Sequence, residues 1–72
     1  MELDYTALGK RIRRRRKELG LTQSVLAERV DLEASNISHI ERGASKVGLG
    51  SLVKIANVLQ CSVDDLLCDS LL

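Results

Sequence analysis

The chain has 72 residues and a net charge of +1; 44% of its residues are apolar, and Phe, Trp and Pro are absent. This length allows one domain over residues 1–72, and the apolar content argues against a disordered chain. No apolar run approaches the ~18 residues of a membrane span. Residues 1–10, MELDYTALGK, lack the apolar core of a signal peptide, so we expect a cytoplasmic protein with no membrane partner.

The charged residues and the cysteines indicate neither a partner nor a metal by themselves. Residues 10–17, KRIRRRRK, are basic except for one isoleucine, whereas the C-terminal segment is acidic. We interpret most of the basic run as a solvated helix face. Cys61 and Cys68 are spaced for neither a CxxC redox pair nor a paired zinc motif. We therefore expect two reduced cysteines, no metal and no cofactor.

The first predicted helix runs from about Asp4 to Leu19 and ends at Gly20, a residue typical of helix C-termini. Its apolar stripe consists of Leu8, Ile12 and Leu19. Ile12 and Leu19 are about two helical turns apart, and Arg15 and Arg16 occupy the position on the same face that lies one turn from each of them. At least one of the two arginines should therefore face inward.

Two shorter helices follow, joined by a tight turn. The second begins at Thr22, a suitable N-cap, and the turn contains Asp31, which tolerates the left-handed conformation better than most residues. The third helix runs from about Ala34 to Arg42 and ends at Gly43. At about 100° per residue, the inward positions of both helices are Leu26, Ala27, Val30, Ile37, Ile40 and Glu41. The outward face of the third helix consists of Ser35, His39 and Arg42, flanked by Asn36 and Ser38.

A loop over residues 43–50 leads to a fourth predicted helix, from about Leu49 to Gln60. Its inward positions are Leu52, Ile55, Ala56 and Leu59. A fifth helix begins at Ser62, which forms a capping box with Asp65. No segment has the period-two alternation of a strand or an Asn-Gly hairpin turn. The sequence therefore predicts an all-α fold of five helices.

Four sequence segments, which follow one another from the second predicted helix to the fifth, keep the spacing of a known family: LTQSVLAERV at 21–30, ISHIERG at 37–43, LVKIANVL at 52–59 and SVDDLL at 62–67. Together they closely resemble the phage repressor and Cro-like helix-turn-helix family, also called the Xre family. The resemblance implies a compact lambda-repressor-like domain of five helices. It also implies that the second and third helices contact double-stranded DNA.

The resemblance also assigns DNA contacts to individual positions. Thr22 and Gln23 match positions beside the phosphate backbone, and Gln23 can brace a base-reading side chain. The positions that face base edges are Ala34, Ser35, Asn36 and His39, with Ser38 beside them. Arg42 matches a position near the backbone, and Ser45 and Lys46 lie in a loop that often follows the phosphates. Arginine and lysine neutralise backbone charge, while serine and asparagine can hydrogen-bond base edges.

His39 and Glu41 each have a second interpretation. They form the HxE spacing of zinc deaminases, but the required PCxxC segment is absent, so we expect His39 to contact DNA, or else to be a plain exposed histidine. Glu41 lies on the inward face, where a half-buried carboxylate needs a partner such as Arg16. The resemblance implies the same pair. We predict a structural ion pair between Arg16 and Glu41, not a catalytic one.

Several positions depart from the pattern of the family, and Gly50 weakens the start of the fourth predicted helix. Asp31 and Gln60 stand where the family often has glycine. Glu33 replaces a common Ser or Thr cap, and its charge suits the helix dipole but repels phosphate. Ala34 offers only a methyl group to a base. These departures affect the strength and sequence of DNA binding rather than the fold.

The most consistent interpretation is a small transcription regulator that reads double-stranded DNA with residues 34–42 in the major groove. The alternative from another class is a protein-interaction module, such as an antitoxin or adaptor, that holds its partner through the fourth and fifth helices. An enzyme is the least consistent interpretation, since no catalytic constellation is present. A homodimer contact is predicted at Leu67, Leu71 and Leu72; alternatively, Leu67 is core and the last two residues fray. No small-molecule effector site is visible in the sequence, which also gives no operator, regulated gene or direction of regulation.

Overall fold

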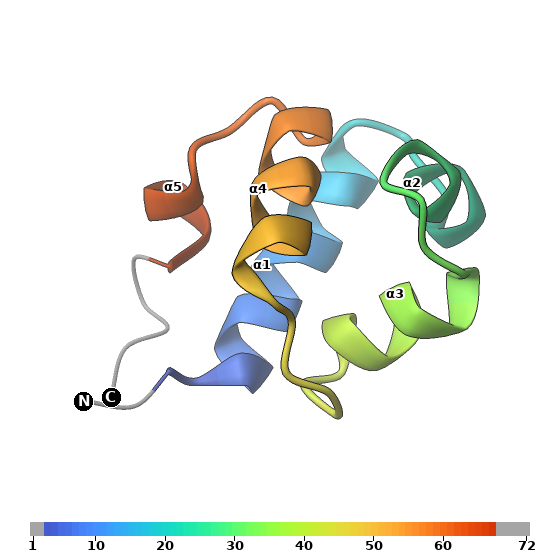
Figure 1. The fold of residues 1–72 in the computed structure, drawn as a ribbon. Helices are drawn as coiled ribbons and strands as arrows, with labels where there is room; N and C mark the ends of the chain where they lie inside the picture. Colours follow the sequence, from blue (N-terminus) through green and yellow to red (C-terminus); the bar gives the residue numbers. More distant parts are fainter. Residues whose placement is uncertain (1–2, 68–72) are drawn as a thin grey trace.

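The fold consists of helices connected by short loops (Figure 1). The structure is a computed structural model, and it describes residues 3–67. The helices within these residues are α1 (Tyr5–Glu18), α2 (Gln23–Arg29), α3 (Ala34–Glu41), α4 (Leu49–Val58) and α5 (Val63–Leu67). The predicted all-α class with five helices is therefore confirmed. No helix in this range is long and apolar enough to cross a membrane.

Local capping interactions set most of the helix boundaries. The Asp4 carboxylate accepts hydrogen bonds from the backbone N–H groups of Thr6 and Ala7, both at 3.1 Å, and so begins α1. The Thr22 hydroxyl accepts from the Val25 N–H at 3.1 Å and begins α2. Each bond satisfies a donor that the first turn of a helix leaves without a partner. The predicted cap at Thr22 is therefore confirmed, and Asp4 is a cap that was not predicted from the sequence.

The fifth helix begins with the predicted capping box. The Asp65 backbone N–H donates to the Ser62 hydroxyl at 3.0 Å, and the Ser62 N–H donates to the Asp65 carboxylate at 3.1 Å. Hydrogen bonding of the Asp65 carboxylate by the Ser62 backbone N–H, and next by the Ser62 hydroxyl, lowers the pKa of Asp65 below its usual value. The box orders the first turn of a helix that is only five residues long.

Left-handed residues turn the chain between helices. Asp31 has a φ of 58° in the turn between α2 and α3, and Gln60 has a φ of 57° after α4. Both positions often hold glycine in the resembling family, and here two non-glycine residues adopt the same conformation. Because Gln60 is left-handed, α4 ends at Val58 and not at Gln60, which corrects the predicted boundary.

The core is aliphatic and draws on all five helices. It consists of Leu8, Ile12, Leu26, Ala27, Val30, Ile37, Ile40, Leu52, Ile55, Ala56, Leu59 and Leu66. Every position predicted to face inward on α2, α3 and α4 is buried, whereas Leu19, predicted for the stripe of α1, is half-buried. Burying one such large side chain contributes about 1.5–3 kcal/mol.

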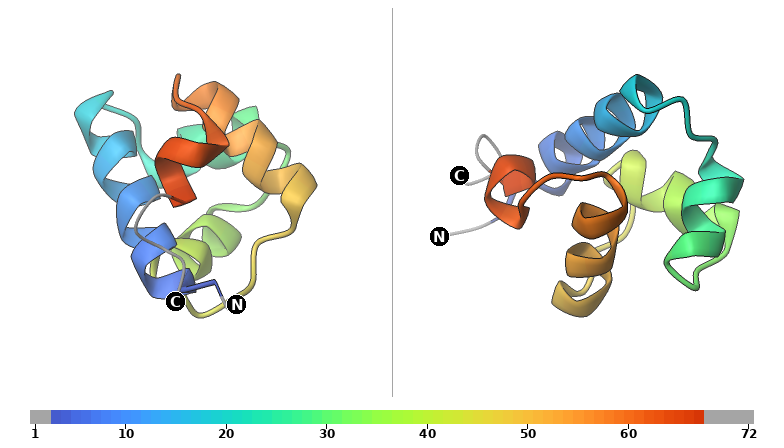
Figure 2. Two further views of the ribbon diagram at one scale, coloured as in Figure 1. Left: turned by 90° about the vertical axis from the view of Figure 1, so that its left-hand side faces the viewer. Right: turned by 90° about the horizontal axis from the view of Figure 1, so that it is seen from above.

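The helices are arranged so that α2 and α3 form one end of the molecule and α5 the other, with α1 and α4 between them (Figures 1 and 2). Helix α3 packs against α1 and α2, and α5 packs against α1 and α4. This arrangement leaves one long side of α3 facing away from the core.

Helices α1 and α3 approach each other at Gly9. A Cβ atom added to Gly9 would lie only 2.5 Å from the carbonyl oxygen of Glu41. Only glycine allows two helix backbones to come this close. The contact fixes the C-terminal end of α3 against α1.

Candidate nucleic-acid interface

The two sides of α3 differ in burial and chemistry. Ile37 is fully buried and Ile40 is 6% exposed, whereas Ser35, Asn36, His39 and Arg42 are exposed. We call these four exposed residues the outward strip. It carries hydroxyl, amide, imidazole and guanidinium groups and no carboxylate. The strip can therefore donate hydrogen bonds to base edges or phosphates and accept them from base edges.

The other residues expected to contact DNA differ in their exposure to solvent. Thr22, Ser45 and Lys46 are exposed, while Gln23, Ala34 and Ser38 are half-buried. Thr22 uses its oxygen to cap α2, which leaves its hydroxyl hydrogen for another acceptor. The Nε atom of Arg42 donates to the Ser38 carbonyl at 3.3 Å, so the side chain lies along the end of α3.

Two helices, α3 and α4, begin without a side-chain cap. Glu33 occupies the N-cap of α3, and its side chain does not bond the first turn; Gly48 occupies the N-cap of α4 and has no side chain that could do so. Uncapped N–H groups at a helix start suit an anion such as phosphate. The exposed carboxylate of Glu33 opposes this at α3 but not at α4. The N-terminus of α4 was not singled out in the sequence, although Gly48 in place of Ser, Thr or Asp was a signal for it.

The position of α3 is fixed from the inside by an ion pair. The Arg16 Nε atom donates to Glu41 Oε2 at 2.6 Å, and its Nη2 atom donates to Glu41 Oε1 at 2.9 Å. Arg16 is 7% exposed and Glu41 is 5% exposed. The bond to Glu41 raises the pKa of Arg16, although burial opposes the rise. The predicted structural pair is present and is bidentate, the strong form of this interaction.

Two further bonds extend the pair to the start of α2. The Arg16 Nη1 atom donates to the Leu21 carbonyl at 2.8 Å. The Gln23 Nε2 atom donates to Glu41 Oε1 at 3.1 Å. Arg16, Glu41, Gln23 and Leu21 therefore form one network, which we call the inner network. It ties α1, the entry to α2 and the end of α3 together.

The second inward arginine on α1 serves another helix. The Arg15 Nε atom donates to the Leu59 carbonyl at 2.9 Å, at the C-terminal end of α4. Both Arg15 and Arg16 therefore point toward the body of the domain, as the sequence had suggested for at least one of them. Arg13, Arg14 and Lys17 are exposed, in keeping with a solvated face.

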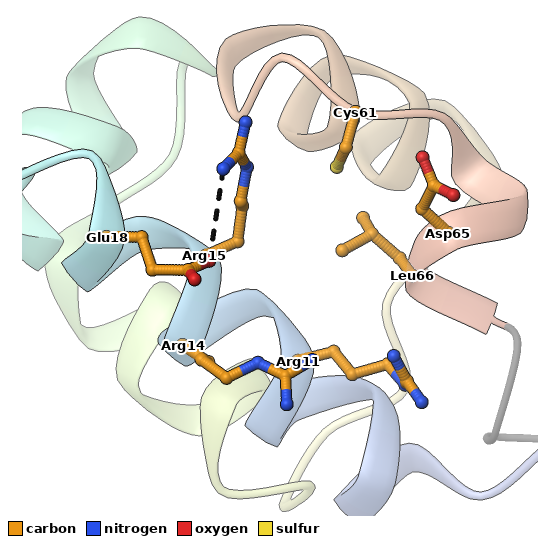
Figure 3. Close-up of a pocket in the computed structure, with 7 residues that line it drawn as sticks. All are labelled: Arg11, Arg14, Arg15, Glu18, Cys61, Asp65 and Leu66. Atoms are coloured by element: carbon orange, nitrogen blue, oxygen red, sulfur yellow. Dashed lines mark ion pairs between the residues drawn. The ribbon is translucent and has the colours of Figure 1, made fainter.

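A hollow of about 240 Å³ lies between α1 and α5, away from α3 (Figure 3). Its lining residues are Arg11, Arg14, Arg15, Glu18, Cys61, Asp65 and Leu66. Arg15 is bonded to the Leu59 carbonyl and lies 3.9 Å from Glu18, and Asp65 belongs to the capping box of α5. Partial burial raises the pKa of Cys61, which disfavours the reactive thiolate. Several polar groups of the hollow thus already have structural roles.

Residues 12–66 match a family model described as Helix-turn-helix. The chain belongs to the helix-turn-helix family. The expected resemblance to phage repressors is confirmed, because the domain is similar to the P22 c2 repressor solved in complex with a synthetic operator. The TM-score is 0.80 and the identity 36%, over 93% of this chain and 96% of that chain.

Two further proteins extend the comparison. The domain is 40% identical over 62 residues to the HTH-type transcriptional regulator DicA of Escherichia coli (strain K12), covering 86% of this chain and 46% of DicA. It is also similar to the restriction-modification controller protein C.AhdI from Aeromonas hydrophila, with a TM-score of 0.84 and 33% identity over 88% of this chain and 96% of that chain. The chain spans about half the length of the curated relatives it matches.

The predicted dimer contact of this helix-turn-helix domain is only partly within the described residues. Leu67 is half-buried and packs against the core, next to the buried Leu66. Leu71 and Leu72 lie outside the described residues. The dimer contact therefore stays a prediction. Among residues 3–67, Leu49 and Val53 of α4 are exposed large apolar side chains, at 73% and 42%.

Proposed function

We propose that this domain binds double-stranded DNA as part of a cytoplasmic transcription regulator, with α3 in the major groove. The observation that carries the proposal is the exposed outward strip of α3, since the opposite face of the same helix is held by buried apolar residues and the inner network. A rigid helix with exposed serine, asparagine and histidine is suited to read base edges. The similarity to a repressor solved with its operator supports the same docking.

Ser35, Asn36 and His39 read sequence in this proposal, together with Ala34 and Ser38 at the edge of the outward strip. Thr22, Arg42, Ser45 and Lys46 hold phosphates, which fixes the orientation of α3 without reading sequence. Selection of binding sites from random duplexes tests the proposal most directly. We expect an enriched half-site, and a pool that stays random would contradict sequence-specific binding.

The phosphate contacts can be tested by salt dependence. Removing one phosphate contact should reduce the slope of log K against log salt by about 0.9. We expect this reduction for Arg42→Ala and for Lys46→Ala. The matched control is Arg14→Ala, because Arg14 is an exposed arginine that lines the hollow beside α5. Equal slopes for Arg42→Ala, Lys46→Ala and the wild type would remove both residues from the interface.

A homodimer would place two copies of α3 on one face of the duplex, with half-sites about 34–36 Å apart. We propose Leu67, Leu71 and Leu72 as its contact. Sedimentation at micromolar concentration, alone and with a selected duplex, tests this. A protein that stays monomeric and binds a single half-site would exclude the dimer.

A second candidate function is to hold a protein partner, as an antitoxin or adaptor does. The exposed Leu49 and Val53 on α4 favour it, because that helix is one of the two that this function would use. The two functions differ in their dependence on salt. DNA binding should weaken steeply as salt rises, whereas contact through apolar side chains should not.

A further inference from the structure

The side-chain amide of Gln23 is held in one orientation. Its Nε2 atom lies 3.1 Å from Glu41 Oε1. A carboxylate in an ion pair can only accept hydrogen bonds, so the group that faces it must be the amide nitrogen and not the amide oxygen. The nitrogen of Gln23 therefore points inward and the oxygen points away from Glu41.

Glu41 is well suited to hold this orientation because both its side chain and its backbone are held by close contacts. Both of its oxygens accept from Arg16, at 2.6 and 2.9 Å, and its side chain is 2% exposed. Water therefore has little access with which to replace Gln23. The backbone of Glu41 is fixed as well, since it lies against Gly9.

The fixed orientation determines what Gln23 offers on its exposed side. The free edge of the amide carries one N–H group and the carbonyl oxygen, which is one donor beside one acceptor. A phosphate has only acceptors, so it can use the N–H group alone. The oxygen needs a donor, which either the amino group of a base or a donor side chain of the outward strip can supply. The opposite orientation would instead offer two donors, the better arrangement for a phosphate.

We propose that Glu41 is a positioning residue for DNA binding, which acts by holding the Gln23 amide so that its free edge presents a donor and an acceptor. The inference rests on the DNA-binding function proposed above. The group that binds this edge provides a donor and an acceptor together. Adenine does so on its major-groove edge, and a donor side chain of the outward strip does so together with a phosphate oxygen.

A double-mutant cycle tests the inference on a selected duplex. Gln23→Met removes the amide and keeps the side-chain length. We expect it to weaken binding about tenfold in the wild type. In the Arg16→Met/Glu41→Met variant, which replaces the whole ion pair by apolar side chains, the same change should weaken binding less than about threefold. An equal loss in both backgrounds would overturn the inference and leave Glu41 a structural residue only.

The cycle separates the inference from the function on which it rests. A wild type that binds no duplex at low salt would refute the proposed function and the inference together. A wild type that binds, with equal losses from Gln23→Met in both backgrounds, would refute the inference alone. Where Gln23→Met weakens binding more in the wild type than in the ion-pair variant, the loss is then measured on duplexes of different sequence. The dependence of the loss on the DNA sequence identifies the group that binds the free edge of the amide. A loss confined to one base pair indicates a base edge, and a uniform loss indicates the outward strip and phosphate.

Nuclear magnetic resonance of the wild type gives a second test if the ion-pair variant does not fold. The chain has two glutamines, Gln23 and the exposed Gln60, so each side-chain amide can be assigned and compared. One Gln23 amide proton should exchange with solvent more slowly than those of Gln60. On adding the duplex, the other Gln23 proton should shift while the protected one stays protected. Exchange as fast as that of Gln60 would overturn the inference.

Discussion

Replacing Gly9 by alanine tests whether the contact between α1 and α3 is as close as the structure shows. A Cβ at this position would lie 2.5 Å from the Glu41 carbonyl oxygen and 2.7 Å from its carbonyl carbon. These are backbone atoms of a packed helix, so α3 must move as a unit to make room. Because the change also improves helix propensity, the two effects have opposite signs.

The magnitudes predict which effect dominates. Overpacking a close contact costs about 1–3 kcal/mol, and replacing glycine by alanine within a helix gains about 1 kcal/mol. Alanine normally keeps contacts of 3.4 Å or more, so a contact of 2.5 Å should bring the cost to the upper end of its range. We expect Gly9→Ala to destabilise the domain by about 1–2 kcal/mol. That is a large fraction of the about 4–11 kcal/mol expected for a domain of this size.

Urea denaturation followed by circular dichroism measures this difference, and Gly50 provides the matched control. Gly50 lies in α4, and nothing would lie within 4 Å of a Cβ atom added there. Gly50→Ala should therefore stabilise the domain by about 0.4–1 kcal/mol. If Gly9→Ala were as stable as Gly50→Ala, the reasoning about the helix contact would be refuted.

Three further predictions concern stability. Glu41→Ala removes one partner of a buried ion pair and should cost about 3 kcal/mol, measured by the same denaturation; a midpoint equal to that of the wild type would contradict it. Gln60→Gly should raise stability by up to about 1 kcal/mol, because glycine adopts a φ of 57° without strain; a lower melting temperature would count against this reason. The bonds from Ser62 lower the pKa of Asp65, so its contribution is complete above the ordinary carboxyl pKa and disappears as pH falls through the lowered value. Melts of wild type and Asp65→Asn between neutral and acid pH should therefore converge at the acid end, and a constant difference would exclude this linkage.

Local signals made the helices of this chain predictable. Asp4, Thr22 and Ser62 are capping residues whose bonds form within three residues along the chain, so their effect does not depend on the rest of the fold. The apolar spacing on α2, α3 and α4 indicated the buried faces for the same reason. The end of α4 was placed too late because the sequence did not show that Gln60 adopts the left-handed conformation.

Contacts between distant segments were harder to predict. The pair of Arg16 with Glu41 could be anticipated because burying either charge without an oppositely charged partner is unfavourable. The bond from Gln23 to Glu41 and that from Arg15 to the Leu59 carbonyl depend on how the helices pack, which no local pattern encodes. Gly9 also drew no attention in the sequence, although a glycine inside a helix often marks a close approach.

The division of α3 into two faces has a consequence for how such a domain can be retargeted. Ile37, Ile40 and Glu41 hold the helix in place, and the exposed Ser35, Asn36 and His39 make none of those contacts. With the docking proposed above, a library of substitutions at the three exposed positions should change the preferred operator while the melting temperature stays nearly constant. The proposed docking therefore predicts that this scaffold accepts new binding specificities without compensating changes in its core.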